Sequence, residues 1–113
     1  MRINSYSFGR IEVDGVPYSK DVIILRDRVV SPWWREAGGH VFAPLDLADV
    51  IAAKPEAVVL GTGSFGRVKV LPELLQQLPG SEVIVEKTGR AVETFNRLTE
   101  DGRNVVAALH LTC

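Results

Sequence analysis

The second half of the chain alternates between short apolar runs and segments with helical periodicity, and this alternation constrains the fold more than any other feature. The apolar runs at 57–60, 83–85 and 105–109 are typical of strands that are covered on both faces. The segments between them, at 71–78 and 91–98, carry apolar residues at the spacing of one helical face. The order strand, helix, strand, helix, strand predicts a largely parallel sheet joined by right-handed crossovers.

The boundaries of the helices are indicated by capping and breaking residues. Pro72 lies near the first turn of one helix, and Thr88 is expected to cap the N-terminus of the next. Asp101-Gly102 closes that second helix. A further short helix is predicted at 47–51, and it must end before Lys54-Pro55.

The first third of the chain has the period of strands instead. Residues 10–13 alternate polar and apolar side chains, and Asp14-Gly15 is a typical two-residue hairpin turn before the returning arm at 16–18. Residues 22–25 and 28–31 predict two more strands. We therefore expect an N-terminal antiparallel β-meander.

The segment Trp33-Trp34-Arg35 lies in an expected irregular connection at 31–40. Paired indoles followed by a guanidinium could stack a planar ligand or anchor a partner. Because adjacent side chains usually diverge, the pattern favours one indole in the core and one covering a seam. Arg35 could then fix the loop to a carboxylate such as Asp46.

The composition excludes several classes of function. The chain has 113 residues, expected to form one domain over 1–113, and its formal net charge is −1. Nucleic-acid binding is not expected, because proteins that bind phosphate backbones usually carry a clear basic excess. No apolar stretch approaches the ~20 residues that span a bilayer, so no membrane contact is expected. The single cysteine, Cys113, cannot form an intrachain disulfide, and residues 1–6 lack the apolar core of a signal peptide, so we expect a cytoplasmic protein.

The strongest chemical signal is Gly61-Thr62-Gly63-Ser64-Phe65-Gly66, a G-x-G-x-x-G motif directly after a buried strand. In dinucleotide folds such glycines let backbone N–H groups approach a pyrophosphate, and Glu86 stands where an acidic residue would hold a ribose. However, residues 67–70 alternate like a strand or extended loop, and Pro72 places the helix start several residues late. Three parallel strands are also too few for a full dinucleotide fold. The motif therefore favours a tight Gly-rich turn, and no cofactor is expected.

Other candidate catalytic and metal-binding residues also favour structural interpretations. Ser64 does not form a nucleophile elbow, because that turn needs a glycine where Thr62 stands. A Cys113 thiolate beside His110 could be nucleophilic, but residues three apart on a strand point to opposite faces. His40 is the only other histidine, and no metal-binding spacing is present. No catalytic or metal-binding residues are therefore predicted.

Short motifs in a fixed order are spread over essentially the whole chain. They are Ser7-Phe8-Gly9-Arg10-Ile11, Trp33-Trp34-Arg35, Gly39-His40, Gly61-Thr62-Gly63, Thr88 with Ala91-Val92 and Phe95-Asn96-Arg97-Leu98, and His110-Leu111-Thr112-Cys113. Together they resemble a family of small α/β domains of unknown function, which includes mitochondrial complex I assembly factor 3 and an adipogenesis-associated Mth938-type domain protein. The resemblance implies a three-layer α/β fold in which helices flank a mixed central sheet with one strand antiparallel to the rest. It leaves the direction of the last strand open.

The leading functional hypothesis is a non-enzymatic protein-interaction or assembly-type module, whose partner is another protein or a second copy of the chain. It rests on the missing catalytic constellation, on the near-neutral charge and on the assembly factor in the similar family. Such a module should show an exposed apolar patch or a sizeable oligomer contact.

The alternative hypothesis is a site for a small anionic ligand, a phosphate or a carboxylate, which could carry a weak enzymatic activity. Ligands in open α/β sheets favour the carboxyl ends of the strands. The loop after the strand at 57–60, the turn after 83–85 and the chain end would converge there. The candidate binding residues are Gly61, Thr62, Gly63, Ser64, Lys87, Thr88 and His110.

Overall fold

A five-stranded mixed sheet forms the centre of the computed structural model, which describes residues 1–113. Its strands, in spatial order, are β5 (Val29–Val30), β4 (Val22–Ile24), β10 (Val105–His110), β7 (Ala57–Thr62) and β9 (Glu82–Glu86). β7 pairs in parallel with both β10 and β9, as the alternation of strands and helices predicts. β4 is antiparallel to both of its neighbours, so it is the one strand that opposes the rest. The last strand, β10, therefore runs parallel to β7, its neighbour in the sheet, and to β9.

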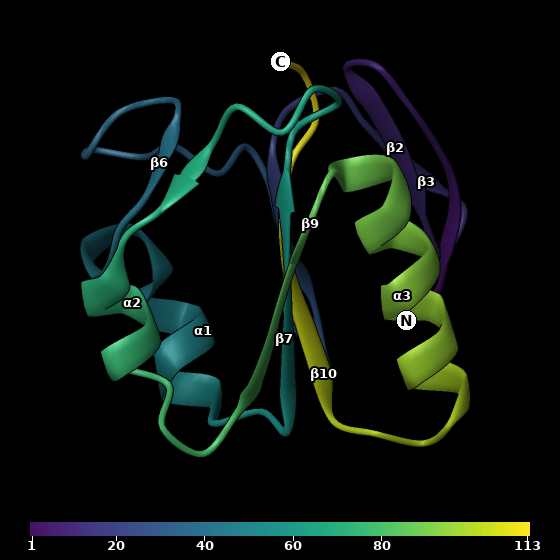
Figure 1. Cartoon of the computed structure of the whole chain (residues 1–113). Helices are drawn as coiled ribbons and strands as arrows, with labels where there is room; N and C mark the ends of the chain where they lie inside the picture. Colours follow the sequence, from purple (N-terminus) through teal and green to yellow (C-terminus); the bar gives the residue numbers. More distant parts are fainter.

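Two layers cover the faces of this sheet (Figure 1). One face carries the 3-10 helix η1 (Pro44–Leu47), α1 (Ala48–Ala53) and α2 (Pro72–Gln76). The other carries α3 (Thr88–Glu100) and a separate antiparallel sheet of β1 (Ile3–Ser7), β2 (Arg10–Val13) and β3 (Val16–Tyr18). The three-layer α/β fold with a mixed central sheet and an N-terminal antiparallel sheet is confirmed.

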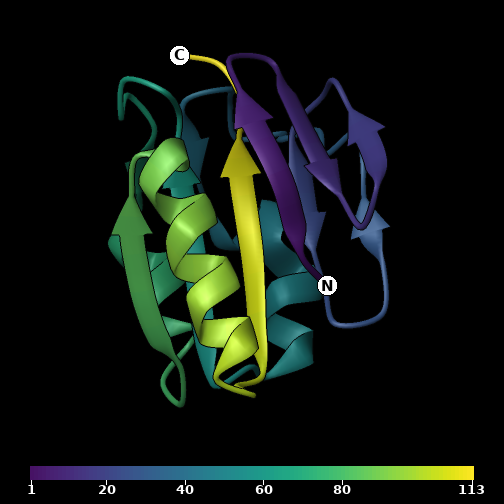
Figure 2. The same ribbon diagram turned by 90° about the vertical axis from the view of Figure 1, so that its right-hand side faces the viewer.

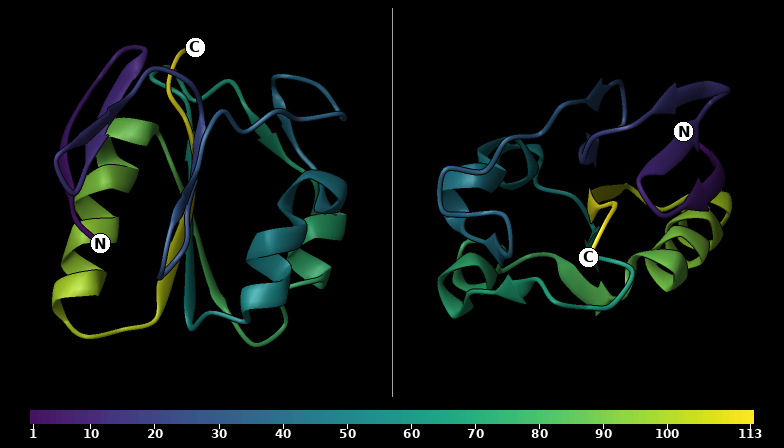
Figure 3. Two further views of the ribbon diagram at one scale, coloured as in Figure 1. Left: turned by 180° about the vertical axis from the view of Figure 1, so that it is seen from behind. Right: turned by 90° about the horizontal axis from the view of Figure 1, so that it is seen from above.

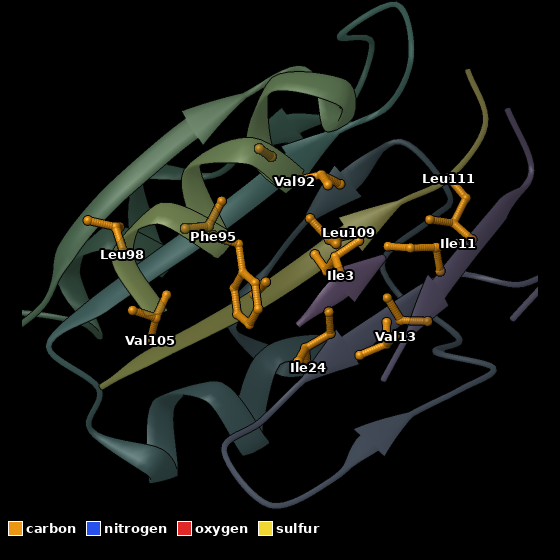
Figure 4. Packing of buried hydrophobic residues seen from close by; sticks show 14 of the residues in the cluster. Ile3, Ile11, Val13, Ile24, Val92, Phe95, Leu98, Val105, Leu109 and Leu111 are labelled. Atoms are coloured by element: carbon orange, nitrogen blue, oxygen red, sulfur yellow. The ribbon is translucent and has the colours of Figure 1, made fainter. Parts of the chain in front are cut away.

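The buried strands send alternate side chains into two separate cores. In β10, Ala107 and Leu109 belong to the core beneath α3, whereas Val106 and Ala108 belong to the core beneath α1 and α2. This is why residues 105–109 of the strand are all apolar. Figure 4 shows the first core, in which side chains from α3, β10, β4 and the N-terminal sheet pack together, among them Ile3, Ile11, Val13, Ile24, Val92, Phe95, Leu98, Val105 and Leu109.

The N-terminal strands differ from the predicted meander in the sheet that they join. β2 and β3 form the predicted hairpin, and Asp14 and Gly15 have the positive φ angles, 48° and 80°, that a two-residue turn of this kind needs. β1 was not predicted, because only Ile3 among its side chains is buried. β4 and β5 belong to the central sheet. All three residues of β4 are buried, which suits a strand covered on both faces rather than one in a half-exposed meander.

The short helices begin and end close to the predicted residues. α1 ends at Ala53, just before Lys54 takes a left-handed φ of 46°, and α2 begins at Pro72. The irregular connection predicted at 31–40 ends in β6 (Val41–Phe42), which pairs in parallel with β8 (Lys69–Val70). None of the helices combines the length and the hydrophobicity needed to cross a membrane.

The carboxyl ends of the parallel strands gather several loops around the residues that follow β10. The N–H of Gly9, in the turn between β1 and β2, donates to the Leu111 carbonyl (2.9 Å), and the N–H of Ser64, after β7, donates to the Thr112 carbonyl (2.8 Å). Figure 2 shows the C-terminus beside the β1–β2 turn, and the view from above in Figure 3 shows it between the two covering layers. This end of the molecule carries the candidate site.

Candidate functional site

The predicted ligand-site residues converge at this edge of the central sheet. Thr62 of β7 is in register with His110 of β10. Thr88 begins α3, and only Lys87 separates it from the end of β9. The Thr88 hydroxyl joins the segments, because it accepts a hydrogen bond from the Gly63 N–H (2.9 Å) and donates one to the His110 carbonyl (2.6 Å). The three predicted segments therefore meet, while the binding of a ligand by them remains a prediction.

The chain itself uses the donors of this loop. The Ser64 N–H donates to the Thr112 carbonyl (2.8 Å), and the Ser64 hydroxyl shares a hydrogen bond with that of Tyr6. The Thr62 hydroxyl donates to the Glu86 carbonyl (3.1 Å). These bonds tie the loop to β9 and to the chain end, so its polar groups act as cross-links between neighbouring segments.

Two glycines of the loop are required by close packing. A Cβ atom at Gly61 would lie 2.7 Å from Cδ2 of Leu109. At Gly63, where φ is 101°, a Cβ atom would lie 2.8 Å from the Thr112 carbonyl oxygen. Both contacts are too short for any other residue without displacement of the chain. They support the interpretation of the motif as a tight Gly-rich turn.

Thr88 was predicted to cap α3, and this prediction is wrong. Thr88 is the first helical residue, and Lys87 precedes it without a side-chain capping bond. The hydroxyl instead forms hydrogen bonds with the Gly63 N–H and the His110 carbonyl, two groups at the ends of neighbouring strands. Thr88 has no exposed surface, and a buried hydroxyl needs such partners.

A buried ionic cluster of Asp21, Arg35 and His110 lies beside these loops. Arg35 Nη1 donates to Oδ2 of Asp21 (2.7 Å), and the same oxygen lies 2.6 Å from Nδ1 of His110. The second carboxylate oxygen of Asp21 accepts the Leu111 N–H (2.8 Å). Arg35 Nη2 donates to the Gly39 carbonyl (2.6 Å), which fixes the irregular connection over the cluster.

The expected pairing of Arg35 with Asp46 is not present. Asp46 accepts hydrogen bonds from the N–H groups of Glu36 (2.7 Å) and Ala37 (3.1 Å) and so stabilises the turn after Arg35. Asp21, which precedes β4, lies closer to the guanidinium because β4 is the neighbour of β10 in the sheet. The sheet order thus decides which carboxylate Arg35 reaches.

The Asp21 carboxylate is held in its ionised form. Its burial alone would raise its pKa, but hydrogen bonds from His110, from the Leu111 N–H and from Arg35 outweigh the burial and lower the pKa below the usual value of 3.8. When the His110 imidazole is protonated, its positive charge also lowers the pKa of Asp21. A carboxylate that remains charged here orients the imidazole and balances the guanidinium.

Arg35 is the most constrained side chain of the cluster. Only 4% of its side-chain surface is exposed, and its guanidinium lies 4.8 Å from the centre of the Trp33 ring. Its Nε is buried and has no hydrogen-bond partner, although every other buried polar atom of the cluster has one. The His40 ring meets that of His110 edge-on at 5.7 Å.

A cavity of about 440 Å³ opens on this cluster. Its walls come from the segment before β4, from the irregular connection and from the chain after β10, and they are Ser19, Lys20, Asp21, Pro32, Trp33, Trp34, Arg35, Gly39, Leu111 and Thr112. Trp33 is buried, and its Nε1 donates to the Asp46 carbonyl (2.8 Å), whereas Trp34 is 76% exposed at the rim. The expected division of the two indoles therefore holds for Trp33, and Trp34 faces outward. No group of three or more His, Cys, Asp or Glu side chains could hold a metal ion.

Sequence reasoning missed Asp21, Lys20 and Thr112 as residues of this cavity. Asp21 and His110 are 89 positions apart, and their contact depends on β4 lying next to β10. Asp21 also stands in an ordinary polar stretch that resembles a solvated turn. His110 is the one predicted ligand-site residue that also belongs to the ionic cluster.

The chain is similar in sequence and in structure to proteins without an assigned role. A family model described as "Protein of unknown function (DUF498/DUF598)" matches residues 3–110. A conserved hypothetical protein from Pyrococcus horikoshii is 25% identical, with 100% of each chain covered and a TM-score of 0.84. A protein from Bordetella parapertussis is 31% identical, with 97% of this chain and 94% of that chain covered and a TM-score of 0.69. A Mth938-like domain from Bordetella pertussis is 26% identical, with 97% and 85% covered and a TM-score of 0.66. No curated protein matches the chain.

Proposed function

Because the chain belongs to this DUF498/DUF598 family of proteins of unknown function, we propose its function from the geometry of its own residues: it binds a small anionic ligand, a carboxylate or a phosphate, in the cavity beside Arg35. The proposal keeps the ligand class expected from the sequence. It moves the binding residues from the Gly-rich loop to the neighbouring cavity, because the chain itself uses the donors of that loop.

The buried guanidinium of Arg35 is the observation that carries this proposal. Removing a charged group from water costs several kcal/mol, and even a paired buried charge contributes little to stability compared with apolar packing. Arg35 keeps one donor, Nε, without a partner, which adds to that cost. A protein that only needed to fold would place an apolar side chain there. Perturbed and costly groups of this kind concentrate at functional sites.

The position and the charges of the cavity support an anionic ligand. The cavity lies at the carboxyl ends of the parallel strands, where open α/β sheets place their ligands. Asp21 balances the charge of Arg35, so the ammonium of Lys20 supplies the surplus positive charge of the walls. Trp34 at the rim offers an exposed aromatic face on which a planar part of a ligand can stack.

Replacing Trp34 with alanine is expected to weaken binding about fivefold, which corresponds to the roughly 1 kcal/mol of an aromatic contact. Binding of benzoate and of inorganic phosphate is measured by calorimetry, and the loss should be larger for benzoate because phosphate has no ring to stack. Lys20→Gln should weaken the binding of both anions. Phe65→Ala is the matched control, since Phe65 is also exposed but does not line the cavity. Absence of binding in the wild type, or an equal loss in the Trp34 and Phe65 variants, would contradict the proposal.

A protein-interaction surface is the second candidate function, and one observation favours it. Phe8, in the β1–β2 turn, and Phe65, in the Gly-rich loop, are both exposed, and their rings lie 6.3 Å apart. Arg67 lies 6.0 Å from the Phe65 ring. Exposed aromatic residues beside an arginine are typical of the centres of protein interfaces. A second copy of this chain is the simplest partner for such a patch.

The double variant Phe8→Ser, Phe65→Ser tests this second function. If the two rings form a self-association surface, the wild type should dimerise with rising concentration in sedimentation velocity, and the double variant should remain monomeric. Leu45→Ser is the control, because Leu45 is equally exposed on a different layer. A wild type that stays monomeric at millimolar concentration would remove dimerisation as a function of this patch.

A further inference from the structure

We propose that Thr112 is a nucleophile for acyl transfer from small esters, with His110 as its general base and Asp21 as the residue that positions the imidazole. The inference rests on the proposed ligand site, since Thr112 and Asp21 both line that cavity. It assigns a reaction to the cavity in addition to binding.

The three side chains are hydrogen-bonded in series. Oδ2 of Asp21 lies 2.6 Å from Nδ1 of His110, and Nε2 of the same imidazole lies 3.3 Å from the Thr112 hydroxyl oxygen. The hydrogen bonds between carboxylate, imidazole and hydroxyl therefore follow the order required for nucleophile activation by a base that a third group orients. A distance of 3.3 Å in a structure without substrate is within the range from which such contacts tighten.

The surroundings of His110 determine which nitrogen carries the proton. Nδ1 lies 2.6 Å from the ionised Asp21 carboxylate and 3.3 Å from Nη2 of Arg35. The shorter contact, to the carboxylate, places the proton of the neutral imidazole on Nδ1, so Nε2 keeps its lone pair for the Thr112 hydroxyl. Asp21 itself cannot swing away, because it also accepts bonds from Arg35 and from the Leu111 N–H. His110 is in turn buried, with 9% of its side chain exposed, so the ring keeps one orientation.

Thr112, in contrast, is accessible. It is the only hydroxyl residue of the cavity besides Ser19, it is partly exposed, and its carbonyl is anchored by the Ser64 N–H. The anchored backbone holds Thr112 beside the imidazole, and the hydroxyl lies 3.3 Å from Nε2 of His110. The positive charge of Lys20 on the cavity wall would stabilise the negative charge that develops on the ester oxygen.

The reaction balances without any other reagent than water. The Thr112 oxygen forms a bond to the carbonyl carbon of the ester, and its proton moves to Nε2 of His110. The bond from that carbon to the leaving oxygen then breaks, and Nε2 returns the proton to the leaving alcohol. In the second half, water attacks the acyl-Thr112 ester by the same route, so the acid is released and the Thr112 hydroxyl is restored.

The test treats the full chain with 4-nitrophenyl acetate and follows both nitrophenolate release and the acetylated residue by peptide mass spectrometry. We expect an acetyl ester on Thr112 that hydroxylamine removes, unlike the stable amides that this reagent forms on lysines. Thr112→Val should abolish the ester and lower the rate of release by about 10²-fold, because without the hydroxyl the base His110 has no nucleophile to activate. Thr112→Ser should restore both. Ser7→Ala is the control, because Ser7 is an exposed hydroxyl residue at the end of β1 outside the cavity.

Binding of inorganic phosphate to the wild type and to Thr112→Val separates the two levels of the proposal. If phosphate binds to both proteins but no ester forms on Thr112 of the wild type, the nucleophile is overturned and the ligand site stands. If phosphate binds to neither, the ligand site fails and the reaction fails with it. Equal rates of nitrophenolate release in the wild type and in Thr112→Val would also overturn the assignment of Thr112.

Discussion

The variant Asp21→Asn should unfold with a free energy about 3 kcal/mol below that of the wild type near pH 7. The carboxylate balances the buried guanidinium of Arg35 and holds His110 and the Leu111 N–H. Removing one partner of a buried pair leaves the other charge without compensation, which typically costs 3–5 kcal/mol. Because Asp21 is not fully enclosed, we expect the lower end of that range. Urea denaturation followed by far-UV circular dichroism measures the difference.

The pH dependence of this difference has a definite sign. The pKa of Asp21 is lower in the folded protein than its usual value of 3.8, so the folded state prefers the ionised group. The stabilisation is complete above the usual value and is lost as the pH falls through the lower pKa of the folded state. The gap in unfolding free energy between wild type and Asp21→Asn should therefore narrow as the pH falls below about 4. Asp27→Asn is the control, since Asp27 forms an exposed pair with Arg28 that contributes below about 1 kcal/mol. A gap that is unchanged at pH 3 would contradict the role of the ionised carboxylate.

The variant Thr88→Val should lose about 2–6 kcal/mol of unfolding free energy, although valine has nearly the shape of threonine. The Thr88 hydroxyl satisfies the Gly63 N–H and the His110 carbonyl, and its loss leaves two buried polar groups without partners. Each such group costs roughly 1–3 kcal/mol. Thermal unfolding by calorimetry measures the loss.

The chain offers a closely matched control in Thr99, which lies in the same helix. Its hydroxyl is also buried but has no hydrogen-bond partner, so Thr99→Val removes no bond and should be neutral or slightly stabilising. Equal effects of the two substitutions would show that the cost comes from replacing threonine in α3 rather than from the bonds between strand ends.

The regular elements of the second half were predictable because their signals are local. The apolar runs and the helical stripes of residues 57–109 depend on neighbours within a few positions, and the structure confirms the parallel strands and the helices between them. The N-terminal strands carry weaker signals. The sequence around β4 gives three apolar residues in a row, which fit a meander and a central strand equally well until the whole sheet is assembled.

The site was predictable only where its residues belong to a motif. His110 stands out because it ends an apolar strand, and Arg35 because it follows two tryptophans. Asp21 carries no such signal, since a carboxylate in a polar stretch is indistinguishable from a solvated one. The Thr88 hydroxyl was assigned to a local cap because sequence rules describe neighbours along the chain, whereas its true partners lie 25 and 22 positions away.

The strand order has a consequence for the way in which the chain reaches its native state. β10 lies at the middle of the central sheet and is the only strand that joins the β5–β4 pair to the β7–β9 pair. The two pairs come from opposite halves of the sequence and have no ladder with one another. Neither of the two cores can form completely before residues 105–110 insert between the two strand pairs. During translation, the earlier strands therefore keep unpaired edges and exposed apolar side chains until this segment has left the ribosome. Contacts of such long sequence separation favour slow folding, and the unpaired strand edges are most prone to aggregation in the interval before insertion.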